Sequence, residues 1–196
     1  MKEEIKPRDI VIPDQIIDKT KNRPLSFFGN GLVAHVSFAD PFCNCLRDTL
    51  YKATKKVGCK THFGGIYVCM EGPQFSTRAE SNLHRAWGAS VIGMTAIPEA
   101  KLAREAEMCY ASIALATDYD CWHEEEEAVT SDAVMEIVKN NSDTAKKIIK
   151  AVLPMISDKR KCSCASALSV SLVTPKELVP RETFEKVKLL VGKYMK

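Results

Sequence analysis

Long apolar runs and long basic stretches are both missing from this chain of 196 residues. The longest apolar stretch, 110–117, is far shorter than the roughly 20 residues that a membrane-spanning helix needs. The first twenty residues are charged and contain proline, without the apolar core of a secretory signal. The net charge of +3 is spread along the chain and forms no basic stripe. We therefore expect a cytoplasmic protein that binds neither membranes nor nucleic acid.

Glycine and histidine are scarce as well. None of the nine glycines belongs to a glycine-rich loop of the kind that cradles phosphate groups. The four histidines are scattered, so only His35 carries a functional interpretation, which is given below. Internal repeats and low-complexity tracts are also missing. With 45% apolar and 27% charged residues, the chain fits an ordinary soluble globular protein with one core.

Cysteine, in contrast, is abundant. The eight cysteines stand at positions 43, 45, 59, 69, 109, 121, 162 and 164. In a protein expected inside the cell, so many cysteines indicate buried thiols, a metal site, or the intracellular disulfides of a thermophile. The many charged residues and few glycines fit the thermophile alternative.

Strand and helix patterns alternate along the chain, which predicts an α/β fold. Apolar runs and turn residues predict strands over 10–17, 66–70, 90–94 and 109–117. Apolar periodicity and capping signals predict helices over 41–57, 78–87, 95–107, 131–152 and 174–194. The strand at 109–117 is apolar on both faces, as expected in the middle of a covered sheet. We expect an α/β domain over 1–156, then a linker and a terminal helix in 157–196 that packs on the domain or on a neighbouring subunit.

Two carboxylates follow the last of these strands, in the segment Thr-Asp-Tyr-Asp at 117–120. Asp118 and Asp120 are two residues apart, so both are expected to point into the crevice where α/β sheets bind ligands. Carboxyl groups there can accept a hydrogen bond from an amino group or donate a proton to a ring nitrogen. Taken alone, the pattern favours a loop or a metal-binding pair over a nucleobase site.

The segment 71–81, Glu-Gly-Pro-Gln-Phe-Ser-Thr-Arg-Ala-Glu-Ser, combines a tight turn with an aromatic ring. Phe75 can stack on a base and Ser76 can bond to its polar edge. A capping-box pattern at 77–80 follows, so the segment also fits a turn with a core phenylalanine and a helix cap. Met-Thr at 94–95 marks a strand-to-helix junction, where the hydroxyl can contact phosphate or simply cap the helix.

Together these segments resemble the 5'-methylthioadenosine phosphorylases of the purine nucleoside phosphorylase superfamily, particularly the archaeal type. The resemblance runs almost without gaps from Ile5 to about Cys164, roughly four fifths of the chain. The matching segments are 9–15, 34–43, 71–81, 93–99, 108–111 and 117–120.

The resemblance implies a mixed-sheet α/β sandwich that assembles as a homo-oligomer, either a trimer or a hexamer of two trimers. It also implies phosphorolysis: phosphate attacks C1' of 5'-methylthioadenosine and releases adenine and 5-methylthioribose 1-phosphate. Inorganic phosphate is then a co-substrate, and no cofactor or metal is expected.

Residue by residue, the resemblance assigns the base to two segments. Phe75 and Ser76 would flank the purine. Asp118 and Asp120 would bind the 6-amino group and protonate the departing base, with Tyr119 between them. The 6-oxopurine phosphorylases resemble this pattern but carry an asparagine there, so the acids imply an aminopurine substrate.

The resemblance assigns the rest of the nucleoside to other positions. Met94 would pack under the ribose and Thr95 would hold phosphate. His35 would reach across the trimer interface to a neighbour's 5' end. The methylthio group would be surrounded by Ser131, Val134 and Met135. Because many relatives have an aliphatic residue where Ser131 stands, a 5'-hydroxyl, and hence adenosine itself, is also expected to fit.

The resemblance further implies a fold that is incomplete at its N-terminus, because full-length relatives carry roughly eighty to ninety residues ahead of Met1. That part holds the phosphate loop, an Arg-His pair and a further Thr or Ser contact. We therefore expect the C-terminal piece of a split, truncated or misannotated reading frame, which needs a separately encoded N-terminal fragment for full activity. Two alternatives stay open: a broader purine nucleoside phosphorylase that also accepts inosine, and a non-catalytic subunit.

By the same resemblance, Cys43 and Cys109 stand where hyperthermophilic relatives have a disulfide, and 162–164 resembles their C-x-C. We expect a Cys43–Cys109 disulfide, with reduced thiols as the alternative. A Cys162–Cys164 disulfide would close a small, strained ring that is easily reduced. Zinc binding by Cys43, Cys45, Cys162 and Cys164 is the competing interpretation. It has the right ligand number but lacks the commoner C-x2-C spacing, so no metal is expected.

Overall fold

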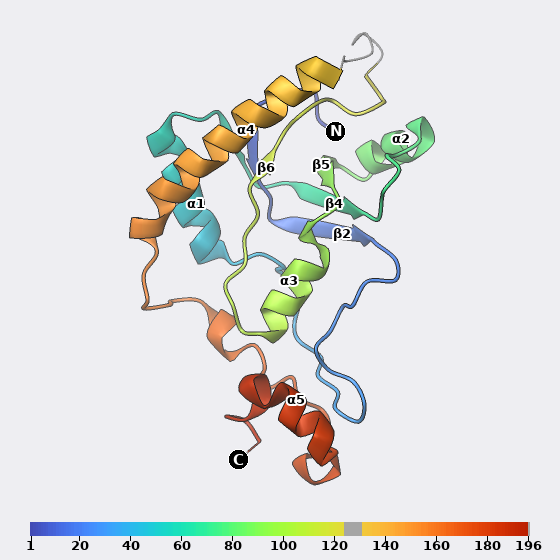
Figure 1. Ribbon diagram of the computed structural model, residues 1–196, viewed down its shortest axis with the longest axis vertical. Coiled ribbons are helices and arrows are strands. Elements are labelled where there is room, and N and C mark those ends of the chain that lie inside the picture. Colours follow the sequence, from blue (N-terminus) through green and yellow to red (C-terminus); the bar gives the residue numbers. More distant parts are fainter. Residues whose placement is uncertain (124–130, 196) are drawn as a thin grey trace.

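The computed structural model describes residues 1–123 and 131–195, without the side chains of 131–134. Figure 1 shows the strands in the centre, helices on both sides of them, and the C-terminal part extending below this body. Within the described residues there are two three-stranded sheets, with the orders β3-β1-β6 and β2-β4-β5. The strands are β1 (Ile10–Ile12), β2 (Gln15–Lys19), β3 (Thr61–Phe63), β4 (Ile66–Met70), β5 (Ala89–Gly93) and β6 (Ala114–Leu115).

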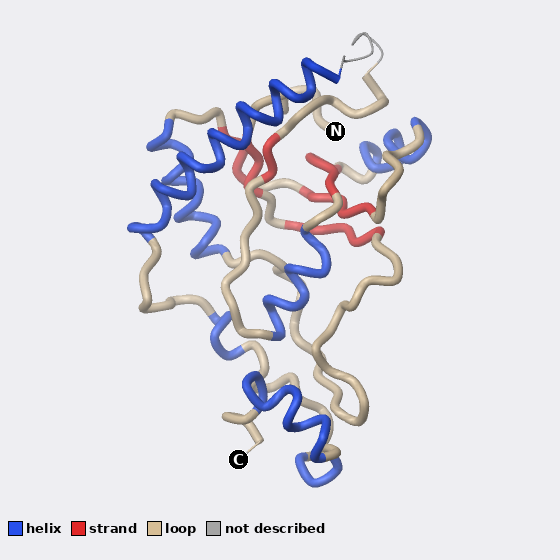
Figure 2. Tube along the Cα trace, viewed as in Figure 1, coloured by secondary structure: helices blue, strands red, loops and turns tan. Residues whose placement is uncertain are grey.

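Helices surround these sheets, as the colouring by secondary structure in Figure 2 shows. The α-helices are α1 (Asn44–Val57), α2 (Arg78–Ala86), α3 (Ala96–Glu105), α4 (Ser131–Val152) and α5 (Arg181–Val191). Short 3-10 helices are η1 (Leu153–Met155), η2 (Ser163–Ser166) and η3 (Lys176–Leu178). None of the helices in the described part of the chain combines the length and the apolar character needed to cross a bilayer.

The two sheets meet where the chain bends between consecutive strands. Pro13 and Asp14 separate β1 from β2, and Gly64 and Gly65 separate β3 from β4. The Asp14 carboxylate accepts the Gly65 N–H at 3.0 Å, which joins the two bends. A Cβ on Gly65 would lie 2.3 Å from the Ser90 Oγ, and the φ of Gly65 is +114°, so only glycine fits there. As a result, β1 pairs in parallel with β3 in one sheet, and β2 pairs in parallel with β4 in the other.

Side chains alternate along β1 and are buried on both faces of its sheet. Ile10 and Ile12 pack with Leu50 of α1 and Ile148 of α4. Val11 points to the opposite side and joins a cluster that includes residues of α3. Because helices cover both faces, the body is the α/β sandwich that the sequence predicts, and the antiparallel pairing of β1 with β6 makes the first sheet mixed.

Local sequence signals set several element ends as expected. Gly58 ends α1 in the left-handed conformation, with φ of +82°. Thr77 and Glu80 form the predicted capping box, in which the Thr77 hydroxyl accepts the Glu80 N–H and the Glu80 carboxylate accepts the Thr77 N–H at 2.8 Å. Strands β4 and β5 and helix α4 also confirm the predictions.

Several predicted elements differ from the structure. The strand predicted over 10–17 is two strands, β1 and β2, in different sheets, and the helix predicted over 174–194 is η3 followed by α5, which begins at Arg181. Helix α1 begins at Asn44 rather than at 41, because Cys43 is extended and donates its N–H to the Tyr110 carbonyl at 2.7 Å. The predicted strand 109–117 is wrong except for β6, since only Ala114 and Leu115 pair with β1. The segment is half-buried rather than enclosed on both faces, so its apolar composition does not mark the middle of a sheet.

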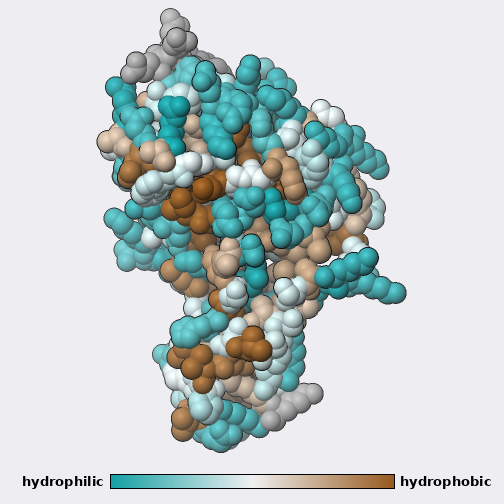
Figure 3. Space-filling model, turned by 180° about the vertical axis from the view of Figure 1, so that it is seen from behind, coloured by the Kyte–Doolittle hydropathy of each residue, from teal (hydrophilic) through white to brown (hydrophobic). Residues whose placement is uncertain are grey.

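The C-terminal part has its own apolar cluster. Leu168, Val187 and Val191 are buried there together with Leu32 from the loop after β2. A bridge between Ala34 and Leu172 joins the two chain segments. Seen from behind in Figure 3, apolar side chains gather both in the middle of the body and on this C-terminal part. The division of the chain at residue 156 stays a prediction.

Candidate functional site

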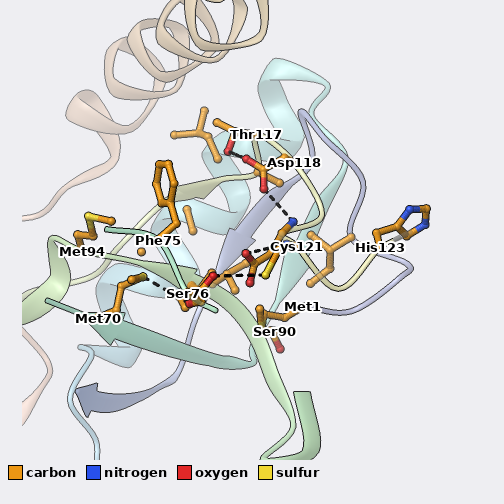
Figure 4. A pocket seen from close by; sticks show the side chains of 18 residues that line it. Met1, Met70, Phe75, Ser76, Ser90, Met94, Thr117, Asp118, Cys121 and His123 are labelled. Carbon is orange, nitrogen blue, oxygen red and sulfur yellow. Dashed lines mark hydrogen bonds between the residues drawn. The ribbon is translucent and has the colours of Figure 1, made fainter. Parts of the chain in front are cut away.

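A cavity of about 760 Å³ lies beside β5, bordered by the end of β4 and by the segment that follows β6 (Figure 4). We call it the β5 cavity. Its wall combines 90–94 with Met70, Phe75, Ser76 and residues of 114–121. Crevices at the carboxyl ends of strands are where α/β sheets bind ligands, and a mostly apolar wall with a few polar groups is typical of small-molecule sites.

Both predicted carboxylates, Asp118 and Asp120, line the β5 cavity. Asp118 accepts the Thr117 hydroxyl at 2.7 Å and the backbone N–H of Asp120 at 2.8 Å. Asp120 accepts the Ser81 hydroxyl at 2.8 Å and the Cys121 N–H at 2.9 Å. These bonds orient the two carboxylates, while each still has lone pairs for a ligand, because an ionised carboxylate offers about four acceptor sites.

Aromatic packing holds this loop against the body. Tyr119 stacks on His123 with 4.7 Å between ring centroids, and Trp122 packs edge-on against both rings. The Arg85 guanidinium lies 3.5 Å from the centre of the Trp122 ring. Tyr119 therefore supports the loop in this structure and is not among the residues that line the β5 cavity. Its predicted contact with the purine stays a prediction.

The segment between β4 and α2 supplies an aromatic side chain to the cavity. Phe75 lines the β5 cavity and is 83% exposed, so the alternative of a core phenylalanine is wrong. Ser76 also lines the cavity, and its carbonyl accepts the Cys121 thiol at 3.4 Å. Two segments far apart in the sequence thus meet at this wall.

Arg23 holds the ends of β4 and β5 together, a role that the sequence patterns did not indicate. Its guanidinium donates to the carbonyls of Met94 at 2.6 Å and of Glu71 at 2.8 Å, and it pairs with the Glu71 carboxylate at 3.1 Å. Arg23 thereby fixes the position of Met94, which lines the β5 cavity. Its predicted contact with the ribose stays a prediction. No local motif marks this arginine, because its partners are about fifty or more residues away in sequence.

Thr95 lies at the N-terminus of α3, next to the cavity but not on its wall. Its hydroxyl caps no backbone N–H, so the alternative of a plain helix cap is wrong. Burial raises the pKa of Tyr67, whose hydroxyl is hydrogen-bonded to Thr95. A Cβ on Gly93 would lie 2.0 Å from that hydroxyl, which explains the glycine at the end of β5. Tyr67 and Ser81 carry no recognisable signal in the sequence, since their partners depend on the tertiary fold.

Other predicted site residues lie away from the β5 cavity or outside the described part. His35 is exposed in the loop after β2, where its N–H donates to the Ser171 carbonyl at 2.8 Å. Its predicted reach into a neighbouring subunit concerns an assembly and stays a prediction. Met135 is 67% exposed on α4 and does not line the cavity. The side chains of Ser131 and Val134 lie outside the described residues.

The cysteines differ from the expectation. All eight are free thiols, so the predicted Cys43–Cys109 disulfide is not formed. Cys109 has its Sγ 3.3 Å from the Sγ of Cys162 instead, too far for a covalent bond. Four cysteines come together at this place: Cys43, Cys109, Cys162 and Cys164. Cys109 thus stands where the competing zinc interpretation had placed Cys45.

Comparison with known proteins identifies the family. A family model described as the phosphorylase superfamily matches residues 1–154. The S-methyl-5'-thioadenosine phosphorylase of Geobacter sulfurreducens is 57% identical over 196 residues, covering 100% of this chain and 68% of that protein. The chain belongs to the S-methyl-5'-thioadenosine phosphorylase family. It is an enzyme family of the phosphorylase superfamily, as the sequence motifs indicate.

Further S-methyl-5'-thioadenosine phosphorylases support the assignment. The protein of Koribacter versatilis is 50% identical over 99% of this chain and 66% of its own length. That of Hyperthermus butylicus is 49% identical over 88% of this chain and 64% of its own length. The chain therefore spans about two thirds of the length of these curated relatives.

Solved structures of related enzymes share the fold. A methylthioadenosine phosphorylase from an antarctic soil metagenomic library is 48% identical, with a TM-score of 0.92 over 96% of this chain and 67% of that one. A methylthioadenosine phosphorylase from Schistosoma mansoni, solved in complex with adenine, is 33% identical with a TM-score of 0.78, covering 87% of this chain and 68% of that one.

Proposed function

We propose that the β5 cavity binds the adenine and ribose of 5'-methylthioadenosine, and that the chain carries the base-binding part of a phosphorolysis site. One observation carries the proposal. The carboxylates of Asp118 and Asp120, the exposed ring of Phe75 and the side chain of Met94 all line the same cavity, although they come from three segments that are distant in sequence. Adenine offers a flat face for stacking, a 6-amino donor and a ring nitrogen that must be protonated as the base leaves.

The two acids have complementary tasks in this proposal. One carboxylate accepts a hydrogen bond from the 6-amino group, and the other, protonated, donates to N7. As the C1'–N9 bond breaks, its electron pair passes to the base and the N7 proton neutralises the developing charge. Ser81 and the Cys121 N–H hold Asp120, and the Asp120 N–H holds Asp118, so the pair is oriented before substrate arrives.

Phosphate provides the new bond to C1'. We propose that it approaches from the side of Thr95, whose hydroxyl caps no backbone N–H and lies at the N-terminus of α3, where an anion is favoured. The transition state is oxocarbenium-like, as in other glycosidic cleavages, so a phosphate anion beneath the ribose stabilises it. Catalysis then needs only inorganic phosphate as co-substrate, with no cofactor.

A single neutral contact such as Thr95 contributes about 1 kcal/mol, which is too little to hold phosphate in water. We therefore propose that full activity needs further phosphate contacts of the kind that longer relatives contain. The assembly belongs to the same proposal: a homo-oligomer, a trimer or a hexamer, would bring His35 of one subunit to the 5' end of the nucleoside bound by its neighbour.

The substrate range is open to direct comparison. Related structures from Schistosoma mansoni are named adenosine/methylthioadenosine phosphorylase, which makes adenosine the natural second substrate to test. Inosine lacks the 6-amino group, so an acid at each of positions 118 and 120 disfavours it. A rate on inosine equal to that on methylthioadenosine would instead support a broader purine nucleoside phosphorylase.

The test is phosphate-dependent release of adenine from methylthioadenosine by the purified chain. It is run alone and with a separate polypeptide that carries the N-terminal third of the Geobacter sulfurreducens relative. We expect Asp118→Asn and Asp120→Asn each to lower kcat/KM by about 10²- to 10⁴-fold, because one variant loses the proton donor to N7 and the other loses the carboxylate that accepts from the 6-amino group. Asp143→Asn, on the exposed face of α4, is the matched control and should leave the rate unchanged.

Three results decide the matter. Turnover by the chain alone refutes the need for further phosphate contacts but keeps the base-binding proposal. Turnover only with the added polypeptide supports both. If adenine binds in both preparations without any turnover, the non-catalytic subunit is the better interpretation.

A further inference from the structure

Four cysteines outside the β5 cavity bring three distant segments together. Cys43 precedes α1, Cys109 follows α3, and the other two belong to the C-x-C at η2. We call them the four-cysteine cluster: Cys43, Cys109, Cys162 and Cys164. Their four sulfur atoms all lie within 4.8 Å of one another. Cys43 and Cys164 are buried, and the other two are half-buried.

The spacing of the sulfurs matches a mononuclear metal site. In a tetrahedral zinc site with Zn–S distances of about 2.3 Å, neighbouring sulfurs are about 3.8 Å apart. Four sulfurs that all lie within 4.8 Å of one another can reach this geometry with small side-chain adjustments. Two disulfides would instead need two separate pairs at about 2.05 Å. The structure shows one group of four.

We propose that the four-cysteine cluster binds one zinc ion as a closed, structural tetrahedral site. Binding replaces the four thiol protons, so one Zn²⁺ is taken up and four H⁺ are released, leaving a site with a net charge of −2. Thiolates select zinc over the hard cations, which prefer oxygen. This site is independent of phosphorolysis, and it departs from the sequence-based expectation that no metal is bound.

The surroundings of the four-cysteine cluster offer both access from solvent and positive charge, which a negatively charged metal site needs. A second cavity of about 560 Å³ is lined by three of the four cysteines and by Arg104, so a metal ion has a route inward. The basic run at 159–161 directly precedes Cys162. Positive charge near the cluster offsets part of the thiolate charge.

The position of the cluster indicates what the ion would do. Two ligands belong to the α/β body, and two belong to the C-x-C at the start of η2 in the C-terminal part. A bound ion would therefore join the C-terminal part to the body across the linker 157–161. Structural zinc sites contribute their binding free energy to folding, so removing the ion should destabilise this connection.

The first experiment measures metal in the full chain, expressed with zinc and purified under reducing conditions without chelator. We expect about one zinc per chain by elemental analysis. Replacement by Co²⁺ should give the intense thiolate-to-cobalt absorption and tetrahedral d–d bands of a four-sulfur site, both abolished by added Zn²⁺. Chelation should lower the Tm by at least about 5 °C.

Cysteine variants distinguish the proposed ligand set from the alternative set that has Cys45 in place of Cys109. Cys109→Ser and Cys164→Ser should lose the zinc and the cobalt spectrum. Cys45→Ser is the matched control: Cys45 is exposed and two residues from Cys43, and its loss should leave the metal content unchanged. Loss of zinc in Cys45→Ser with retention in Cys109→Ser would overturn the assignment of ligands.

The wild-type chain alone can also refute the proposal, even if a variant fails to fold. Absence of zinc together with no cobalt spectrum at micromolar Co²⁺ would do so. A mass two or four hydrogens short of the fully reduced chain, with these cysteines resistant to alkylation, would show disulfides in place of a metal and also contradict it.

Discussion

At the residue scale, the two acids of the candidate site could be predicted from the sequence. The residues that hold the site in place, Ser81 and Arg23, could not. Asp118 and Asp120 belong to a contiguous motif, so their common position on the β5 cavity follows from local order. Ser81 and Arg23 act through partners that only folding brings near, 39 residues away for Ser81. The sequence also gave no means to decide whether Phe75 is buried, because an aromatic ring after a turn fits both a core and a ligand site.

Ser81 offers a test of how Asp120 is held. Ser81→Ala removes the hydroxyl that donates to the Asp120 carboxylate at 2.8 Å. A hydrogen bond of this kind contributes about 1 kcal/mol, so adenine should bind about fivefold more weakly, as measured by titration calorimetry. Ser142→Ala, on the exposed face of α4, is the control. Equal affinity in Ser81→Ala and the wild-type chain would show that Asp120 needs no such support.

At the element scale, the predictions that depended on local chemistry are confirmed. The capping box of α2, Gly58 at the end of α1 and strands β4 and β5 each have a signal within a few residues. The strand at 109–117 was predicted wrongly because apolar composition does not specify pairing partners. Here only β6 reaches the edge of β1, and the rest of the segment runs past α1 and α3. The division into two sheets also escaped prediction, since it depends on the paired bends at Asp14 and Gly65.

The pairing of β1 with β3 predicts a pH dependence of stability. Burial opposes ionisation of Asp9, but hydrogen bonds from His62, Lys60 and the Lys6 N–H outweigh it and hold the pKa of Asp9 below its ordinary value. A carboxyl with a lowered folded-state pKa adds stability above its unfolded pKa of about 3.9, and that stability is lost as the pH falls through the folded value.

Asp9→Asn should therefore lower the free energy of unfolding by about 2 kcal/mol at pH 7, because a buried charge-assisted network is lost. The difference from the wild-type chain should shrink as the pH falls below about 4. Urea denaturation at several pH values measures it, with exposed Asp143→Asn as a control that leaves the midpoint unchanged. A difference that stays constant down to pH 2 would contradict this explanation.

At the scale of the whole molecule, the body and the C-terminal part meet at several polar positions, and Glu107 makes three of these contacts. Its carboxylate accepts the Leu168 N–H at 3.0 Å and the Tyr194 hydroxyl at 2.6 Å, and pairs with Lys193. These contacts span 61 to 87 residues of sequence. Sequence patterns predicted a terminal helix but not where it packs. They also did not predict that Cys43, Cys109, Cys162 and Cys164 come together, because this depends on the tertiary fold.

Glu107→Ala should release the C-terminal part without unfolding the body. Hydrogen exchange in α5 should accelerate by at least about tenfold, while exchange in α2 stays as in the wild-type chain. Exchange followed by mass spectrometry measures both regions in one experiment. Unchanged exchange in α5 would show that the apolar cluster around Leu168 holds this part by itself.

The chain belongs to the S-methyl-5'-thioadenosine phosphorylase family. The central proposal is therefore that Asp118 and Asp120 bind an aminopurine. Calorimetric titration of the purified chain with adenine tests this without involving phosphate. The account predicts saturable binding of adenine, at least about tenfold weaker binding of hypoxanthine, and a similar loss in the double variant Asp118→Asn/Asp120→Asn. Absence of adenine binding, or an affinity that the double variant leaves unchanged, would contradict it.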